Sequence, residues 1–196
     1  GGVQPSATSD VVIPASAVVT IPAATTVLGR SLTVQASGTL AFAATTSILT
    51  LGDGTAGAGN VALSVSATAT ITLTGGDATI NFISTSATQQ TITSGGKTIP
   101  SFTINGAGSS YILGDALTMP VVSTTQIILT AGTFNTGNFA ITGNIINSSG
   151  SSTRTLTLGS SAVSLARNGA AFSVAATGLT VTANTAVITC TLTATV

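Results

Sequence analysis

Two aspartates are the residues of this sequence whose types and spacing come nearest to a catalytic pair. Asp53, in GDG, and Asp77, in GGD, are separated by about 24 residues, a spacing typical of one coil in a repeat protein. In a chain of stacked coils of that length, the two carboxyl groups would share one face, as the carboxyl pair of a glycoside hydrolase requires. Both lie beside glycine, where a short acceptor side chain commonly caps a turn. Because the sequence has no Glu and no His to supply a second kind of acid or base, we expect turn residues here.

Other reactive arrangements are also missing from the sequence. The loop LGDGTAGAGN, from Leu51 to Asn60, resembles a phosphate-binding loop but lacks the Lys next to Ser or Thr, and a strand-like segment follows where a helix is needed. With no His and the single Cys190, neither a Cys and His metal cluster nor a Ser-His-Asp triad can form. We predict a chain that is not an enzyme, with no catalytic residue, no cofactor and no metal site, and the sequence assigns no binding residue.

Charge is scarce. Charged residues make up 4% of the chain and the formal net charge is zero, so there is no basic surface for nucleic acid. Mean hydropathy is +0.64, but Gly, Ser, Thr and Asn interrupt every apolar run before the roughly 20 residues of a spanning helix, and we predict no membrane insertion. We expect Arg30 and Arg154, which each open a strand, to project into solvent and discourage unwanted strand pairing. We expect Lys97 to be solvated at a corner.

The elements that position these residues are strands. Apolar residues recur at every second position, which is typical of half-buried strands, and Thr, Val and Ile fill these segments because branching at Cβ suits a pleated surface. The pattern predicts a single all-β domain over residues 1–196. Because the chain starts at Gly1 without Met, we expect it to be part of a longer or processed polypeptide. The segments with this alternation include VVIP, SLTV, SILTL, TITL, RTLTL and LTVT.

Similar units of a strand followed by a turn recur along the chain. They begin at Ile48, Ile71, Ile127, Leu156 and Leu179. The successive separations, roughly 23, 56, 29 and 23 residues, indicate coils of roughly 20 to 30 residues, about seven to nine in all, within the range of solenoid repeats. We therefore predict a parallel β-helix, or β-solenoid. A β-sandwich or jelly roll is the alternative, because short antiparallel strands produce the same alternation.

The same alternation predicts which side chains face the interior. We expect all six phenylalanines to be core residues, Tyr111 to be a partly buried strand residue rather than a sugar platform, and Cys190 to be a small filler in a half-buried strand. In QIILTAGTFNTGNFAITGN, from Gln126 to Asn144, we expect a corner at Asn135 to Asn138. The expected interior residues are Phe42, Phe82, Phe102, Phe134, Phe139 and Phe172, together with Ile127, Leu129 and Ile141.

Five stretches that cover most of the chain combine short strands with polar turns: SATSDVVIPASAVVTIP, RSLTVQASGTLAF, NFISTSATQQTITSGGKTIPSFTINGAG, LTAGTFNTGNFAITG and SSTRTLTLGSS. They resemble the repetitive β-rich modules of bacteriophage structural and tail-fibre proteins and of related bacterial surface adhesins. The resemblance implies a parallel β-helix and an extracellular scaffold on a virion or cell surface. It implies other structural proteins as partners, copies of the chain in a homo-oligomer, and weak contact with host-surface glycans. It transfers no site residue.

Two other functions are compatible with this sequence. A self-assembling extracellular filament or sheath subunit could pair the strand in AVITCTLTATV with the next copy. An ice-binding β-solenoid could use the T-x-T triplets at Thr68, Thr155 and Thr180, if stacked coils bring them into one flat array.

Overall fold

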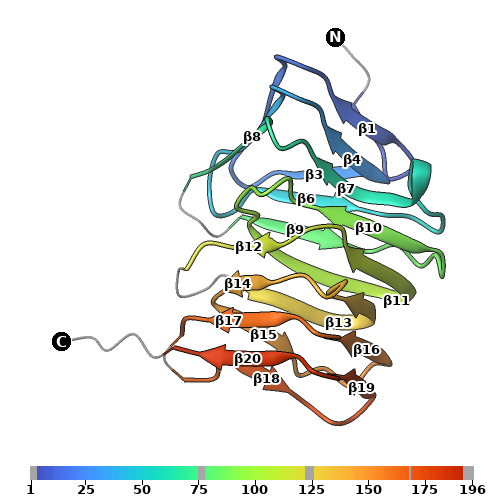
Figure 1. Cartoon of the computed structure of the whole chain (residues 1–196). Helices are drawn as coiled ribbons and strands as arrows, with labels where there is room; N and C mark the ends of the chain where they lie inside the picture. The colour runs from blue at the N-terminus through green and yellow to red at the C-terminus, as the bar shows by residue number, and fades with distance from the viewer. Residues whose placement is uncertain (1–3, 75–77, 122–125, 168, 192–196) are drawn as a thin grey trace.

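The computed structural model is a parallel β-solenoid of about eight turns, which confirms the predicted fold (Figure 1). It describes residues 4–74, 78–121, 126–167 and 169–191. Every pairing among the described strands is parallel. A sandwich or jelly roll needs antiparallel neighbours, so that alternative is wrong. No helix in the described ranges is long and apolar enough to cross a membrane.

The chain winds around three faces, and strands on the same face stack coil upon coil. Face 1 consists of β1 (Asp10–Ile13), β4 (Ser31–Val34), β7 (Val61–Val65), β10 (Gln89–Thr93), the later halves of β11 (Ser101–Leu113) and β13 (Gln126–Asn135), β16 (Arg154–Thr157) and β19 (Leu179–Thr182). Face 2 consists of β2 (Val18–Ile21), β5 (Thr39–Phe42) and β8 (Thr70–Leu73), followed by β12 (Leu117–Thr118), β14 (Ile141–Gly143), β17 (Ala162–Leu165) and β20 (Val187–Cys190). Face 3 consists of β3 (Thr26–Gly29), β6 (Ile48–Leu51), β9 (Thr79–Phe82), the early halves of β11 and β13, β15 (Ile145–Ser148) and β18 (Phe172–Val174).

Coil length varies because the corners differ. On face 1, Asp10 pairs with Ser31 and Leu32 pairs with Leu63, so the second of these coils is about half as long again as the first. The longer coil contains the Gly-rich loop and the short 3-10 turn η1 (Ala58–Asn60). The observed coil lengths agree with the predicted range, but the five predicted repeat units do not occupy equivalent positions in their coils. Ile71 lies on face 2, whereas Ile48 and Ile127 lie on face 3 and the two remaining units lie on face 1. The five units look alike in the sequence because all three faces share one local pattern.

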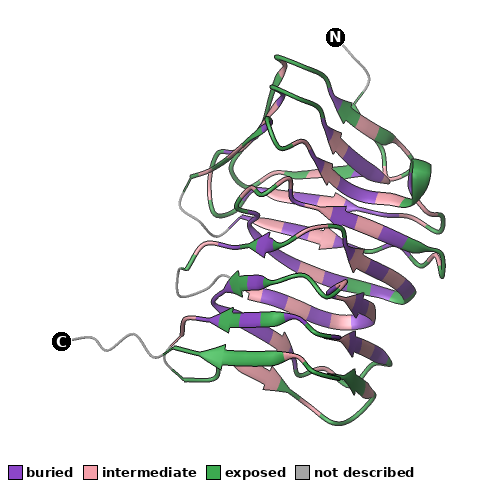
Figure 2. Cartoon of the chain, viewed as in Figure 1, coloured by how far each residue is buried: buried purple, intermediate pink, exposed green. Residues whose placement is uncertain are grey.

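Buried residues alternate with more exposed ones along most strands (Figure 2), and the buried side chains form a continuous core. Phe102 stacks edge to face on both Phe82 and Phe134, with ring centroids 5.7 Å apart in each pair. Tyr111 adds a tilted contact with Phe82 at 5.3 Å. Phe42, Ile127, Leu129 and Ile141 are also buried as predicted, and Phe172 packs against the core from a half-buried position. The prediction of an interior Phe139 is wrong: this residue is 38% exposed, because the turn after β13 places it outside the strand.

Glycine is required where β11 and β13 turn the corner from face 3 to face 1. A Cβ on Gly106 would lie 1.7 Å from the carbonyl oxygen of Ser84 in the preceding coil. Gly132, one coil further on, has φ of +86°, and its Cβ would lie 2.5 Å from the carbonyl oxygen of Gly106. These positions let successive backbones approach directly, so a side chain at either one would push the coils apart.

Candidate functional surfaces

One polar cluster lies at the corner between faces 3 and 1, near the N-terminal end. Asp10 in β1 accepts hydrogen bonds from Nε of Arg30 at 3.0 Å and from the second terminal nitrogen of that guanidinium. The Ser31 hydroxyl at 2.6 Å and the Ala58 amide at 3.2 Å also donate to Asp10. The prediction that Arg30 projects into solvent is therefore wrong: its side chain is 26% exposed and forms an ion pair with Asp10. The cluster joins three coils.

The hydrogen bond from Arg30 is the main reason why the pKa of Asp10 lies far below its usual value; the bonds from Ser31 and Ala58 add to the shift, while partial burial opposes it. A carboxyl group whose pKa is lower in the folded chain than in the unfolded chain stabilises the fold above its unfolded pKa, about 3.9. This stabilisation is lost as the pH falls from that value toward the folded pKa.

We expect Asp10→Asn to lower the free energy of unfolding at pH 7 and to flatten its fall below pH 4. Solvent screening at this partly exposed site limits the effect to about 1 kcal/mol. Urea unfolding of both proteins from pH 2 to pH 8 measures this effect. The difference between the two free energies of unfolding at each pH gives the contribution of Asp10 apart from the other carboxyl groups. Equal acid sensitivity of the two proteins would contradict the assignment. Because the chain has no His, both curves should be nearly flat between pH 5 and pH 8.

Asp53 is a turn residue, as the sequence predicts. Its Oδ1 accepts hydrogen bonds from the amide of Thr55 at 2.7 Å and from the hydroxyl of Thr55 at 2.8 Å. Leu51 pairs with Phe82, and the backbone carbonyl of Asp53 accepts a hydrogen bond from the Thr85 amide. The residues stacked on Asp53 are therefore near Thr85. Asp77 lies outside the described residues.

Arg154 is the main departure from the sequence-based predictions. The sequence predicts a side chain that projects into solvent, but Arg154 is 1% exposed. Nε donates to the Ser148 hydroxyl at 2.8 Å, and the four N–H groups of the two terminal nitrogens bond to backbone carbonyls. All five donors of the guanidinium are thus satisfied without a carboxylate. The accepting carbonyls belong to Ser148, Ser152, Ala175 and Thr177.

A groove of about 260 Å³ lies beside Arg154, and Gly108, Gly132 and Ser152 are among the residues that line it. It offers no free cation to an anionic ligand, because every guanidinium N–H already bonds to the protein. Arg154 holds together the corner between faces 3 and 1 in the last coils, and its position is structural.

Tyr111 does not provide a sugar-binding platform. The residue is 1% exposed, and its hydroxyl oxygen accepts a hydrogen bond from the Ser84 amide at 3.1 Å. Burial raises the pKa of Tyr111 to about 12, although hydrogen bonds from Ser84 and Ser109 oppose the shift. The tyrosine therefore ties two neighbouring coils together from inside.

Two outward faces carry regular rows of neutral polar side chains, most of which bear a hydroxyl group. On face 1, Thr133, Thr155 and Thr180 pair in one row, and a second row of Asn135, Thr157 and Thr182 runs beside it. The triplets at Thr155 and Thr180 thus stack as the ice-binding hypothesis requires. The triplet at Thr68 does not join them, because it leads into β8 on face 2.

On face 2, the row consists of Thr98, Thr118, Thr142, Ser164 and Thr189, all of them exposed. Sequence reasoning did not identify this row. The signal that could have found it is the recurrence of ALT, AIT, AVS and VIT, whose central residues pair and are separated by nearly equal intervals.

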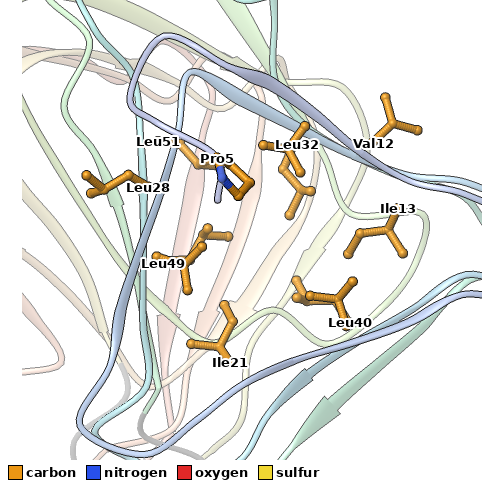
Figure 3. Close-up of a pocket in the computed structure, with 12 residues that line it drawn as sticks. Pro5, Val12, Ile13, Ile21, Leu28, Leu32, Leu40, Leu49 and Leu51 are labelled. Carbon is orange, nitrogen blue, oxygen red and sulfur yellow. The ribbon is translucent and has the colours of Figure 1, made fainter. Parts of the chain in front are cut away.

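The two ends of the described solenoid expose interior side chains. At the N-terminal end, Val19 pairs with the buried Leu40 but is itself 41% exposed. It lines an apolar cavity of about 240 Å³, around which Figure 3 shows the buried Ile13, Leu40 and Leu49. At the C-terminal end, Val181 and Ile188 point inward but are 43% and 37% exposed. Cys190 pairs with Leu165 in an inward position and is also exposed. The prediction of a half-buried Cys190 is wrong, because no described coil covers β20.

These features define a β-solenoid whose outward rows are neutral and hydroxyl-bearing. Among the described residues, no group of three or more His, Cys, Asp or Glu side chains could hold a metal ion. Comparison of the chain with protein-family models, curated proteins and solved structures gives no match to any of them.

Proposed function

We propose that this chain is a non-enzymatic structural module of a virion or cell surface, a scaffold or adhesin of the fibre or spike type. The observation that carries the proposal is a continuous core through about eight stacked coils beneath neutral, hydroxyl-bearing outer rows. The resemblance of the sequence to phage and adhesin modules supports the same function.

The geometry suits a rigid spacer. Each coil of a solenoid packs only on its neighbours, so its contacts run along a single axis. Seven steps of about 4.8 Å separate the first coil from the eighth, which gives a length of roughly 34 Å. The parallel ladders pair most backbone groups internally, and the aromatic stack around Phe102 joins neighbouring coils. Such a module holds its shape without a cofactor.

The proposed location is extracellular, on a virion or cell surface. Its partners are other structural proteins of that surface and copies of the same chain, with weak contact to host glycans through Thr, Ser and Asn side chains. The proposal includes no nucleic-acid partner and no insertion into a membrane. The near absence of charge, 4% of the residues, supports contacts formed by shape and hydrogen bonding rather than by electrostatic attraction.

A filament or sheath subunit is the second candidate, and the exposed interior at both ends of the described solenoid favours it. The cavity at the N-terminal end and the exposed Val181 and Ile188 at the other end are both apolar. Strands on the first and last described coils have open edges, which pair readily with another chain. A head-to-tail contact between copies would cover both ends and generate an open polymer.

Electron microscopy of intact particles, with antibodies against this chain, distinguishes the two candidates. We expect label on capsids, tails or cell surfaces, and no label on particles from a strain that lacks the gene. Label confined to free polymers would contradict the scaffold and support the filament. In that case Val181→Lys, which adds a charge to the exposed end, should abolish the polymer, whereas Thr180→Lys, on the outward side of the same strand, should leave it intact.

A further inference from the structure

Face 2 of the last four coils presents a two-row surface, here named the Ala/Thr face. The hydroxyl row contains Thr118, Thr142, Ser164 and Thr189, and the bridge between Thr98 and Thr118 extends it by one coil. The second row contains small apolar side chains two positions earlier in each coil. All members of both rows are exposed, and the members of the second row are Ala116, Ala140, Ala162 and Val187.

The hydroxyl row is regular along the axis, where stacked strands place equivalent side chains about 4.8 Å apart. Ala162 and Val187 pair within β17 and β20 and lie roughly 6.6 Å from Ser164 and Thr189, as alternate residues of one strand do. Ala116 and Ala140 directly precede β12 and β14. The pairings of β12, β14, β17 and β20 contain no register shift. In Figure 2, exposed and buried residues alternate along β14 and β17, where Ile141 and Val163 point inward and the residues beside them face solvent. The hydroxyl row spans about 19 Å over its four steps.

The side chains of the Ala/Thr face narrow the class of ligand. Neither row contains an aromatic ring on which a sugar could stack. Neither contains the Trp, Tyr or Arg side chains that anchor most protein interfaces, and neither contains a charge. What remains is a repeating pattern of hydroxyl and methyl groups. Hydroxyl groups fix water molecules at the spacing of the array, and methyl groups between them restrict the orientations of neighbouring water.

We propose that the Ala/Thr face binds the surface of ice, through water molecules that its hydroxyl and methyl rows hold in a regular array. This inference goes beyond the scaffold function and does not depend on it. It also places the ice-binding surface on face 2, whereas the stacked T-x-T triplets at Thr155 and Thr180 suggested face 1. Thr155 and Thr157 on face 1 are half-buried, and the residue before Thr157 in its row is Asn135. On the Ala/Thr face, by contrast, both rows are exposed in each of the last four coils.

Thermal hysteresis and ice-crystal shape, measured in a nanolitre osmometer, test the proposal. We expect the purified chain to separate the freezing and melting temperatures and to produce faceted crystals. Thr142→Lys, at the centre of the hydroxyl row, should lose most of the hysteresis because the long cation prevents close contact with ice. Thr155→Lys makes the same change on face 1 and should keep it. Circular dichroism and thermal unfolding confirm that both variants remain folded.

Three results would overturn the proposal. The first is the absence of both hysteresis and faceting in the unmodified chain. The second is loss of activity in Thr155→Lys with retention in Thr142→Lys, which would place the site on face 1. The third is that Thr142→Lys instead dissolves an oligomer seen by sedimentation, or abolishes pelleting with crystalline cellulose or chitin. That outcome would assign the face to a second copy or to a polysaccharide. None of these results bears on the labelling of particles, so the two proposals fail separately.

Discussion

Arg154→Met is expected to lower the free energy of unfolding by roughly 3–5 kcal/mol. The substitution leaves four carbonyl oxygens and the Ser148 hydroxyl without their guanidinium donors. A buried polar group without a partner costs about 1–3 kcal/mol. The total stays below the full sum because the Ser148 carbonyl keeps the amide of Ala175, the Ser148 hydroxyl still donates to the carbonyl of Leu129, and water reaches the partly buried carbonyls. The free energy of unfolding of Arg154→Lys should lie between that of Arg154→Met and that of the unmodified chain, because an ammonium group has three donors rather than five.

Urea unfolding monitored by circular dichroism measures this loss. Arg167→Met is the matched control: it removes the same charge from a half-buried position beyond β17, and we expect a change of about 0.5 kcal/mol or less. Because coils contact only their neighbours, hydrogen exchange should show the largest loss of protection in β18 and β19. Equal effects of the two substitutions, or uniform loss of protection along the chain, would contradict the role given to Arg154.

Phe102→Ala is expected to cost a similar amount, about 3–5 kcal/mol, through the cavity that it leaves. Phe102 is fully buried and stacks between Phe82 and Phe134, so its removal breaks both contacts in the middle of the solenoid. Phe102→Leu retains most of the volume and should lose about 1.5 kcal/mol.

Phe139→Ala serves as the control for the aromatic stack. This residue is 38% exposed, so we expect a loss below about 1 kcal/mol in the same urea experiment. If Phe139→Ala were as damaging as Phe102→Ala, the burial of these two rings would be assigned incorrectly. Together the two phenylalanines test whether the inward row, rather than aromatic content as such, stabilises the fold.

The interior of the solenoid was largely predictable because strand alternation is a local property. A side chain and its neighbour point to opposite sides of any strand, so Phe134 and Ile141 could be placed inside from their immediate surroundings. The prediction for Phe139 was wrong because a turn interrupts the alternation between Phe134 and Ile141. The repeat length was predictable for a related reason, since turn residues recur at each corner.

The stacking of particular residues could not be predicted in the same way. The Gly-rich loop lengthens the coil that begins at Ser31, so residues stacked there are separated by more than an average coil, and register depends on every corner before it. For the same reason the Ala/Thr face was missed, although each of its triplets is visible in the sequence. Only the pairing of Leu117, Ile141 and Val163 shows that the triplets lie in one row.

The sequence by itself determined that this chain forms short strands and that few side chains are available for acid, base or metal chemistry, whereas the parallel pairings of the structure decided for solenoid coils against a sandwich. Periodicity and composition suffice for the two conclusions from the sequence, because each depends on residues near one another in the chain. The tertiary structure decided that Arg154 is buried, that the threonine triplets divide between two faces, and which residues form the Ala/Thr face. Those properties depend on contacts between coils, whose register is the sum of all intervening turns.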